Sequence, residues 1–205
     1  MTTGDAHREG GGLETARRCR ELVERWLADG SFDARFPEVA RLRGVPQPEQ
    51  YHAEGDAWTH TMLAADAVPD CADSRVFWGV LLHDIGKAET TAFIKGRWRS
   101  WGHADAGAEQ VPAIMARLGL ASLSADVAWL VKHHTFHFSW NLTPGARLSP
   151  KQRRFTEHPL FPLLLEVCDA DAAGSRGGSD KGVKIGQLAD MFGDVTKGWA
   201  DPPRR

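Results

Sequence analysis

The chain has 205 residues, of which 42% are hydrophobic, and its formal net charge is -2 at pH 7. This length supports one substantial core, and the nearly balanced charge argues against a general nucleic-acid or membrane binder. Three widely spaced cysteines in no CxxC pattern favour reduced thiols over disulfides or cysteine-bound zinc. We therefore expect a cytoplasmic protein with no membrane association, and the sequence shows no sign of a protein partner.

The sequence predicts one main domain over residues 13–197. Residues 1–12 and 198–205 are predicted to be tails, because they are rich in glycine, proline and charged residues and lack apolar periodicity. The amino-terminal tail lacks the apolar core of a signal peptide, and no apolar run reaches the length of a transmembrane helix.

Helical periodicity marks the first part of this domain. Apolar side chains recur at helical spacing over residues 13–29, and Gly30 favours a helix end there. A short helix is predicted over residues 36–42, before Pro46 and Pro48 impose an extended connection. These residues are expected to pack ahead of the segment that carries the candidate site.

Two further helices are predicted around the first candidate ligands. Asp56 has the side chain and position of an N-cap, so the helix that follows carries His60 in its first turns. Ser74 is the expected cap of the next helix, in which the apolar run 76–82 indicates burial on most sides. Gly86 is expected to end that helix.

The remainder is predicted to be helical apart from one short hairpin. Alternating residues around Lys95-Gly96 favour a small β-hairpin or ordered loop at about residues 90–101. Further helices are predicted at residues 104–118, 124–137, 158–173 and 183–194. The expected fold class is therefore an all-α helical bundle, possibly with this hairpin.

Potential metal ligands recur along the chain beside apolar runs. Histidine nitrogen and carboxylate oxygen are common ligands of divalent ions. A single histidine on an apolar helix face is usually an ordinary core residue, but several unpaired buried histidines and aspartates would be costly without a metal. The ordered set therefore indicates a buried metal site formed by His60, His83-Asp84, His103, His133-His134, and either Asp169 or Asp171.

The same order resembles the H…HD…D signature of the HD superfamily of metal-dependent phosphohydrolases, over roughly residues 36–175. The segments YHAEGDAWTHT, LLHDIGK and GHADAGAE resemble HD modules attached to bacterial CCA-adding tRNA nucleotidyltransferases. They equally resemble the HD modules of bacterial polynucleotide kinase fusions that heal RNA ends. Nothing in the chain resembles a nucleotidyltransferase head or a P-loop kinase. The resemblance implies an HD-domain helical bundle with hydrolase activity, and relatives that work with, or are fused to, a kinase or ligase.

The resemblance also implies which residues hold metal. A first ion would be bound by His60, His83, Asp84 and Asp171, with Asp169 as the rival for the last position. A second ion, bridged through Asp84, would be bound by His103, His133 and His134. The cofactor expected from this set is one or two divalent ions, with Mn, Ni, Co, Fe and Zn favoured over Mg.

Charged residues near these ligands suggest the chemistry. Asp84 is expected to orient or deprotonate a water molecule, and Lys87, about one helical turn further on, to bind a phosphate oxygen. Glu54, Arg99 and Lys132 are the other candidate substrate contacts. The predicted hairpin interleaves cations with aromatic stacking surfaces in Lys95, Arg97, Trp98, Arg99 and Trp101. This pattern fits a nucleotide-binding surface and a plain solvated face equally well.

The leading hypothesis is a metal-dependent phosphohydrolase that acts on a nucleotide or an RNA 3′ end. The resemblance favours 2′,3′-cyclic phosphodiesterase or 3′-phosphatase activity, with a broader nucleotidase as the neighbouring alternative. A di-iron oxygenase is the alternative from another reaction class, since Tyr51 and Glu54 precede the first histidine as in some HD-fold oxygenases. A third possibility is a regulatory module that binds nucleotide or RNA without turnover.

Overall fold

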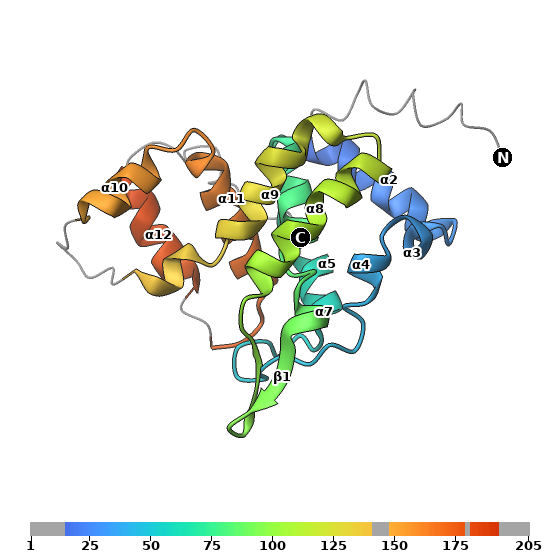
Figure 1. Cartoon of the computed structure of the whole chain (residues 1–205), viewed down its shortest axis with the longest axis horizontal. Helices are drawn as coiled ribbons and strands as arrows, with labels where there is room; N and C mark the ends of the chain where they lie inside the picture. Colours follow the sequence, from blue (N-terminus) through green and yellow to red (C-terminus); the bar gives the residue numbers. More distant parts are fainter. Residues whose placement is uncertain (1–14, 141–147, 179–180, 193–205) are drawn as a thin grey trace, which may run out of the picture.

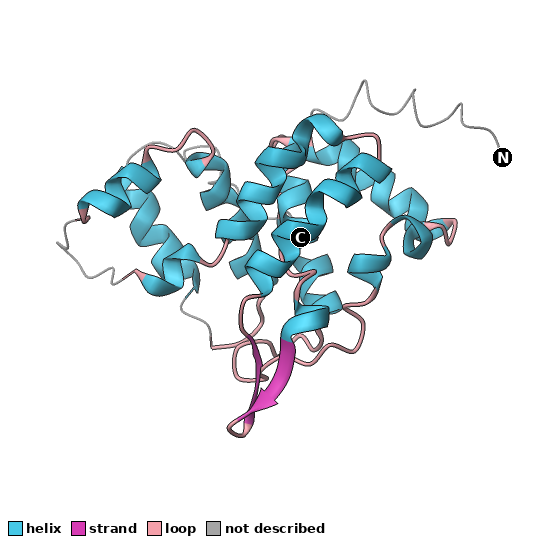
Figure 2. Ribbon diagram, in the orientation of Figure 1, coloured by secondary structure: helices cyan, strands magenta, loops and turns pink. Residues whose placement is uncertain are grey.

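The computed structural model describes residues 15–140, 148–178 and 181–192. Within these ranges helices pack into a bundle, and one two-stranded hairpin projects from it (Figures 1 and 2). The predicted all-α bundle with a small hairpin is confirmed. The predicted tails at residues 1–12 and 198–205 lie outside the described residues.

The amino-terminal helices form one side of the core. Helix α2 (Ala16–Ala28) packs against α6, and two short helices follow it, α3 (Phe32–Arg35) and α4 (Pro37–Ala40). The buried Trp26 ring lies 5.7 Å from that of Phe36, which joins α2 to the segment between α3 and α4. The predicted short helix at 36–42 is therefore present as the shorter α4.

Helix α5 (Ala57–Ala67) begins where the sequence predicts it. Asp56 is its N-cap, and the Asp56 carboxylate accepts a hydrogen bond from the Thr59 N–H at 2.8 Å. The other carboxylate oxygen of Asp56 accepts the Gly44 N–H, so the cap also ties the preceding loop to the helix start. This arrangement fixes the first turns of α5, which carry His60.

The start of helix α6 (Ser74–Leu82) differs from the prediction. Asp73, rather than Ser74, is the N-cap, because the Asp73 carboxylate accepts the Arg75 N–H at 2.8 Å. Ser74 is the first helical residue and is buried. The end also differs, since α6 stops at Leu82 and the next residues form a turn that leads into α7.

The hairpin follows directly from α7 (Lys87–Thr90). Strand β1 (Thr91–Ile94) pairs antiparallel with β2 (Arg97–Ser100), as the sequence predicts. Lys95 and Gly96 form the two-residue turn with φ values of 51° and 77°. Positive φ at both turn positions matches the right-handed twist of the strands, and glycine adopts it without strain.

The second half of the chain completes the bundle. Its long helices are α8 (His103–Arg117), α9 (Ser124–His133) and α11 (Phe161–Gly174), with α12 (Lys181–Phe192) packed on α11. The predicted helix over 124–137 is too long, because the chain leaves the α-helix after His133. Two short 3-10 helices and one helix that the sequence did not predict lie between these elements, namely η1 (Ala121–Leu123), η2 (Phe136–Ser139) and α10 (Pro150–Thr156).

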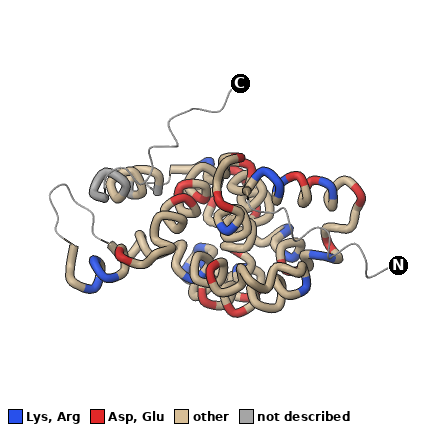
Figure 3. The backbone as a smooth tube through the Cα atoms, turned by 90° about the horizontal axis from the view of Figure 1, so that it is seen from above, with Lys and Arg blue, Asp and Glu red and all other residues tan. Residues whose placement is uncertain are grey.

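The core lies between α5, α6, α9 and α11, which pack against one another around fully buried residues such as Trp78, Leu130 and Leu164. Acidic and basic residues are interspersed over much of the described backbone (Figure 3). In the part of the chain that the structure describes, no helix combines the length and the apolar character needed for a membrane crossing.

Candidate metal centre

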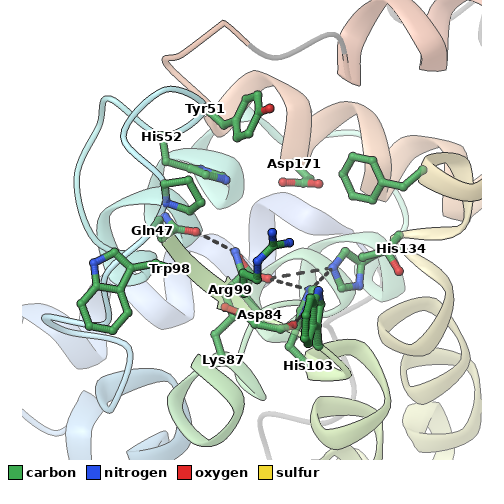
Figure 4. A pocket seen from close by; sticks show the side chains of 15 residues that line it. Gln47, Tyr51, His52, Asp84, Lys87, Trp98, Arg99, His103, His134 and Asp171 are labelled. Carbon is green, nitrogen blue, oxygen red and sulfur yellow. Dashed lines mark hydrogen bonds and ion pairs between the residues drawn. The ribbon is translucent and has the colours of Figure 1, made fainter. Parts of the chain in front are cut away.

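Five segments far apart in the sequence deliver the candidate donors to one place. Helix α5 supplies His60, the turn after α6 supplies His83 and Asp84, and α8 begins with His103. His134 follows the last residue of α9, and Asp171 lies in α11. Figure 4 shows Asp84, His103, His134 and Asp171 around a common space. Five of these six residues are at most 2% exposed, namely His60, His83, Asp84, His134 and Asp171.

The first group of donors surrounds one oxygen of Asp84. Asp84 Oδ2 lies 3.1 Å from His83 Nε2 and 3.8 Å from His60 Nε2. Asp171 Oδ1 lies 2.8 Å from His60 Nε2 and 3.7 Å from His83 Nε2. Two imidazole nitrogens and two carboxylates therefore meet within the reach of a single divalent ion.

The second group lies at the other oxygen of the same carboxylate. Asp84 Oδ1 is 3.4 Å from His103 Nε2 and 3.9 Å from His134 Nε2, and the two imidazole nitrogens are 3.2 Å apart. Asp84 thus presents one oxygen to each group of histidines. This is the geometry in which one carboxylate could bridge two ions.

The histidines are oriented by their other ring nitrogens. In His83, His103 and His134 the Nδ1 atom lies within hydrogen-bond distance of a backbone carbonyl oxygen. Because a carbonyl can only accept, each Nδ1 carries the proton and each Nε2 keeps its lone pair directed at the cluster. The acceptors are the carbonyls of Val80, Ser100 and Val131, at 2.6, 2.7 and 2.7 Å respectively.

Glu54 supports His60 from behind. Its buried carboxylate lies 3.0 Å from His60 Nδ1 and 2.7 Å from His52 Nδ1, and it accepts the Arg176 N–H at 2.8 Å. Burial alone would raise the pKa of Glu54, but these hydrogen bonds outweigh burial and hold the pKa well below its usual range. The substrate contact expected at Glu54 stays a prediction; the side chain is 1% exposed and its carboxylate faces His60 and His52.

The donor set fits a divalent transition metal. His83 Nε2 is buried and makes no hydrogen bond among the described residues, an arrangement that costs free energy unless a ligand takes its lone pair. Burial raises the pKa of Asp84, but the electrostatic influence of its neighbours, His83 and Lys87 among them, outweighs burial and holds the pKa well below its usual range. Burial, together with His83 and His103, lowers the pKa of His134. An ionised aspartate and a neutral histidine are the forms that bind metal.

Two predicted candidates lie away from the cluster. The His133 ring packs against Trp129, with centroids 4.7 Å apart, and against Phe155 at 5.3 Å. The physical reason is that neighbouring helical residues diverge by about 100°, so only one of the two adjacent histidines faces Asp84. Asp169 is exposed, whereas Asp171 points into the cluster.

A cavity of about 410 Å³ opens beside the cluster, and Asp84, His103, His134 and Asp171 line it. Lys87 Nζ lies 2.7 Å from Asp84 Oδ2 and donates to Gln47 Oε1 at 2.6 Å (Figure 4). The sequence offered no local signal for Gln47, because its role depends on a partner 40 positions away. A cation and a candidate metal site therefore share one cavity.

The other predicted cationic contacts divide between this cavity and its surroundings. Arg99 lines the cavity, and its guanidinium lies 5.0 Å from the centroid of the Trp101 ring. Lys132 does not line it; the Lys132 ammonium lies 3.3 Å from the Asp105 carboxylate on the exposed surface.

Two glycines let the backbones approach closely enough to assemble the site. A Cβ atom at Gly86 would lie 2.1 Å from the carbonyl oxygen of His103, and one at Gly174 would lie 2.8 Å from the Ala64 nitrogen. Gly86 thus seats the His83-Asp84 turn against the start of α8. Gly174 seats α11 against α5. The sequence predicted that Gly86 ends a helix. In the structure α6 already ends at Leu82, and Gly86 instead allows the close approach of two backbone segments.

Comparison with known proteins agrees with this geometry. The model of the HD domain family matches residues 56–173. The curated Multifunctional CCA protein of Alkalilimnicola ehrlichii is 37% identical over 163 residues, covering 74% of this chain and 38% of that protein. The protein of the same name from Halorhodospira halophila is 36% identical over 166 residues, covering 78% and 39%.

A third Multifunctional CCA protein, from Psychromonas ingrahamii, is 28% identical over 186 residues and covers 83% of this chain and 45% of the relative. The chain therefore spans less than half the length of these curated relatives. The resemblance to their HD portion that the motifs predicted is confirmed. The chain belongs to the HD domain family, in the superfamily of metal-dependent phosphohydrolases.

Proposed function

We propose that this protein hydrolyses phosphoesters at nucleotide or RNA 3′ ends, with 2′,3′-cyclic phosphates and 3′-phosphates as substrates. The observation that carries the proposal is the position of Asp84. Its two carboxylate oxygens face separate groups of histidines, and Lys87 lies beside it in the same cavity. The motif resemblance to HD modules of RNA-processing enzymes supports the choice of substrate. The cytoplasmic location expected from the sequence accords with it.

The residues that would hold metal fall into two sets that share Asp84. His60, His83 and Asp171 complete the first set, and His103 and His134 the second. When bound, divalent ions make water a stronger nucleophile near neutral pH and offset negative charge on phosphate oxygens. We propose Mn, Ni, Co, Fe or Zn, because histidine nitrogen contributes more than half of these ligands.

The chain's own residues would act on the phosphate and on the attacking water. Asp84 orients the water so that its oxygen attacks phosphorus in line with the ester bond that breaks. The ammonium of Lys87 binds a non-bridging oxygen. The attacking water gives up one proton to Asp84 or to solvent, and the departing oxygen takes up one proton from solvent, so that the elements of one water molecule are added across the P–O bond. With a 2′,3′-cyclic phosphate, one ring P–O bond breaks and a phosphomonoester remains. With a 3′-phosphate, inorganic phosphate leaves.

The oxygenase alternative has less support. Glu54 is buried behind His60 and Tyr51 is 43% exposed at the cavity edge, so neither side chain lies among the donors around Asp84. Lys87 places a positive charge in the cavity, which favours an anionic substrate. Consumption of O₂ by the iron-loaded protein would favour the oxygenase.

The test compares metal-loaded wild type with two aspartate variants. Protein stripped of metal and reloaded with Mn²⁺, Ni²⁺ or Co²⁺ should hydrolyse 2′,3′-cyclic nucleotides and bis-p-nitrophenyl phosphate, and EDTA should abolish both activities. Asp84→Ala should lose activity and most bound metal, measured by mass spectrometry of the elements. Asp169→Ala, which alters an exposed aspartate, should keep both. An Asp84→Ala protein with undiminished hydrolysis would refute the proposal.

A further inference from the structure

The exposed aromatic side chains of this protein gather around one cavity. Among the described residues, the exposed large hydrophobic side chains are Tyr51, Phe93, Trp98, Trp101, Phe138 and Val183. Four of these six also line the cavity that contains Asp84, namely Tyr51, Trp98, Trp101 and Phe138. Large exposed apolar side chains concentrated at one place mark a binding surface. Figure 4 shows Tyr51 and Trp98 at the edge of the space around Asp84.

A second hollow adjoins the first. Its volume is about 430 Å³, and it shares with the Asp84 cavity a wall formed by Trp101, His103, Thr135 and Phe138. Beyond this wall the second hollow extends to Lys132 and Ser139. Trp101 and Phe138, which are 64% and 51% exposed, therefore stand at the boundary of two hollows of similar size.

The charges differ between the two hollows. Lys87 and Arg99 line the first, and Arg99 Nε is buried without a hydrogen-bond partner in the described part of the chain. In the second, Lys132 lies 3.3 Å from Asp105, as Lys87 lies 2.7 Å from Asp84 in the first, so Arg99 is the cation that distinguishes the first hollow from the second. The first hollow thus favours a phosphate, and the second favours an uncharged ring and sugar.

We propose that the two hollows bind two successive nucleotides of a single-stranded RNA 3′ end. This proposal rests on the function proposed for Asp84 and specifies its substrate. The terminal nucleotide and its phosphoester occupy the first hollow. The preceding nucleoside occupies the second, and its base stacks on Trp101 or Phe138. Stacking on exposed aromatic rings requires an unpaired base, so a single strand is selected over a duplex end.

The first test is the dependence of hydrolysis on chain length. We would measure kcat/KM for a mononucleotide, a dinucleotide and a trinucleotide that carry the same terminal 2′,3′-cyclic phosphate. Because stacking of one base stabilises the bound state, kcat/KM for the dinucleotide should exceed that for the mononucleotide by about 5- to 150-fold. The trinucleotide should give a kcat/KM close to that of the dinucleotide. Equal values for all three substrates would overturn the proposal.

Two variants test whether the gain in kcat/KM from a second nucleotide arises at the boundary between the hollows. Trp101→Ala should reduce the ratio of dinucleotide to mononucleotide kcat/KM to near one. Phe93→Ala is the matched control, because Phe93 is 61% exposed on the same hairpin and lines neither hollow. It should keep the wild-type ratio. An unchanged ratio in Trp101→Ala would also overturn the proposal.

A binding measurement separates this proposal from the proposed hydrolysis. EDTA-treated protein would be titrated into a fluorescein-labelled RNA trinucleotide with a 3′-phosphate, and anisotropy recorded. Trp101→Ala should weaken binding about tenfold relative to wild type and Phe93→Ala. Binding that depends on Trp101 without any hydrolysis would sustain the second subsite and refute the proposed activity. Hydrolysis that is equally fast on a mononucleotide and on longer RNA would refute the second subsite and sustain the proposed activity. Equal affinity for a blunt duplex would refute the selection of single strands.

Discussion

The two sides of Asp84 differ in how firmly the fold holds them. On the Oδ2 side, His60, His83 and Asp171 are at most 2% exposed and lie in the interior of the bundle. On the Oδ1 side, His134 is also 2% exposed, but the His103 side chain is 17% exposed and lies at the base of the hairpin beside the cavity. We infer that the Oδ2 side is the stronger metal site and that the Oδ1 side faces the substrate.

The largest effect should come from the buried side. Asp171→Ala removes a carboxylate that lies 2.8 Å from His60, so we expect the metal of this side to be lost. Turnover should fall by about 10³-fold, which corresponds to about 4 kcal/mol of transition-state stabilisation. Asp169→Ala changes an exposed aspartate two positions away in the same helix and should leave both quantities unchanged. Equal losses in the two variants would contradict the assignment.

The open side should give a smaller loss. His134→Ala removes one nitrogen donor beside Asp84 Oδ1 and leaves the Oδ2 group intact. We expect the metal content to fall by about half and turnover by about 10²-fold. His133→Ala is the matched control for metal content, since that ring packs against Trp129 and lies outside the donors around Asp84, although it lines the second hollow. Elemental analysis and steady-state kinetics would measure both variants. Loss of all metal in His134→Ala would show that the two sides are not separate.

Gly86→Ala tests whether the close contact between the His83-Asp84 turn and α8 holds the Oδ1 side of Asp84 together. The added Cβ would meet the His103 carbonyl oxygen at 2.1 Å, so the turn and α8 must move apart. We expect a loss of about 1–3 kcal/mol in the free energy of unfolding, measured by denaturant titration. Metal should be lost from the Oδ1 side first. Gly186→Ala, where a Cβ meets nothing within 4 Å, should be neutral or slightly stabilising.

The smallest effect concerns Glu166, a partly buried carboxyl outside the group of histidines. Burial raises the pKa of Glu166 to about 7, whereas Lys87 and His83 lower that of Asp84. Because the pKa of Glu166 is higher in the folded protein than in the unfolded chain, its protonated form favours folding. This contribution to the free energy of unfolding is fully present below pH 4.5 and is lost as pH rises to about 7. Glu166→Gln removes this dependence. Its Tm relative to wild type should therefore rise by a few degrees between pH 5 and pH 8 in EDTA.

The exposed substitution Glu24→Gln serves as the control for that experiment, and its Tm difference from wild type should not change with pH. A Glu166→Gln protein whose Tm difference is the same at both pH values would contradict the raised pKa.

Periodic patterns predicted most of the helices and the hairpin, because apolar spacing and the Lys95-Gly96 turn are local signals. The cap of α6 was misplaced by one residue, since Asp73 and Ser74 are both good N-caps and only the coordinates distinguish them. Helix α10 was missed, although Ser149 and Gln152 form a capping box at its start. Its short, polar sequence lacks a continuous apolar stripe.

Most of the site could be predicted because its donors stand beside apolar runs in a fixed order. The sequence assigned both His133 and His134 to the second ion, because the residue that faces Asp84 depends on the rotation of α9 relative to its neighbours. The role of Glu54 and the close approach at Gly86 depend on partners distant in the sequence or on backbone spacing. Such contacts are set by packing and leave no periodic trace.

The hydrogen bonds from His83, His103 and His134 to backbone carbonyls bear on the exchange of one metal ion for another. Since each ring is held in place by the backbone, emptying and refilling the centre needs no rearrangement of the protein. Chelation should therefore be reversible without refolding. The identity of the resident ion would then follow the supply of metals in the cell, so one polypeptide could exist as several catalytically distinct forms.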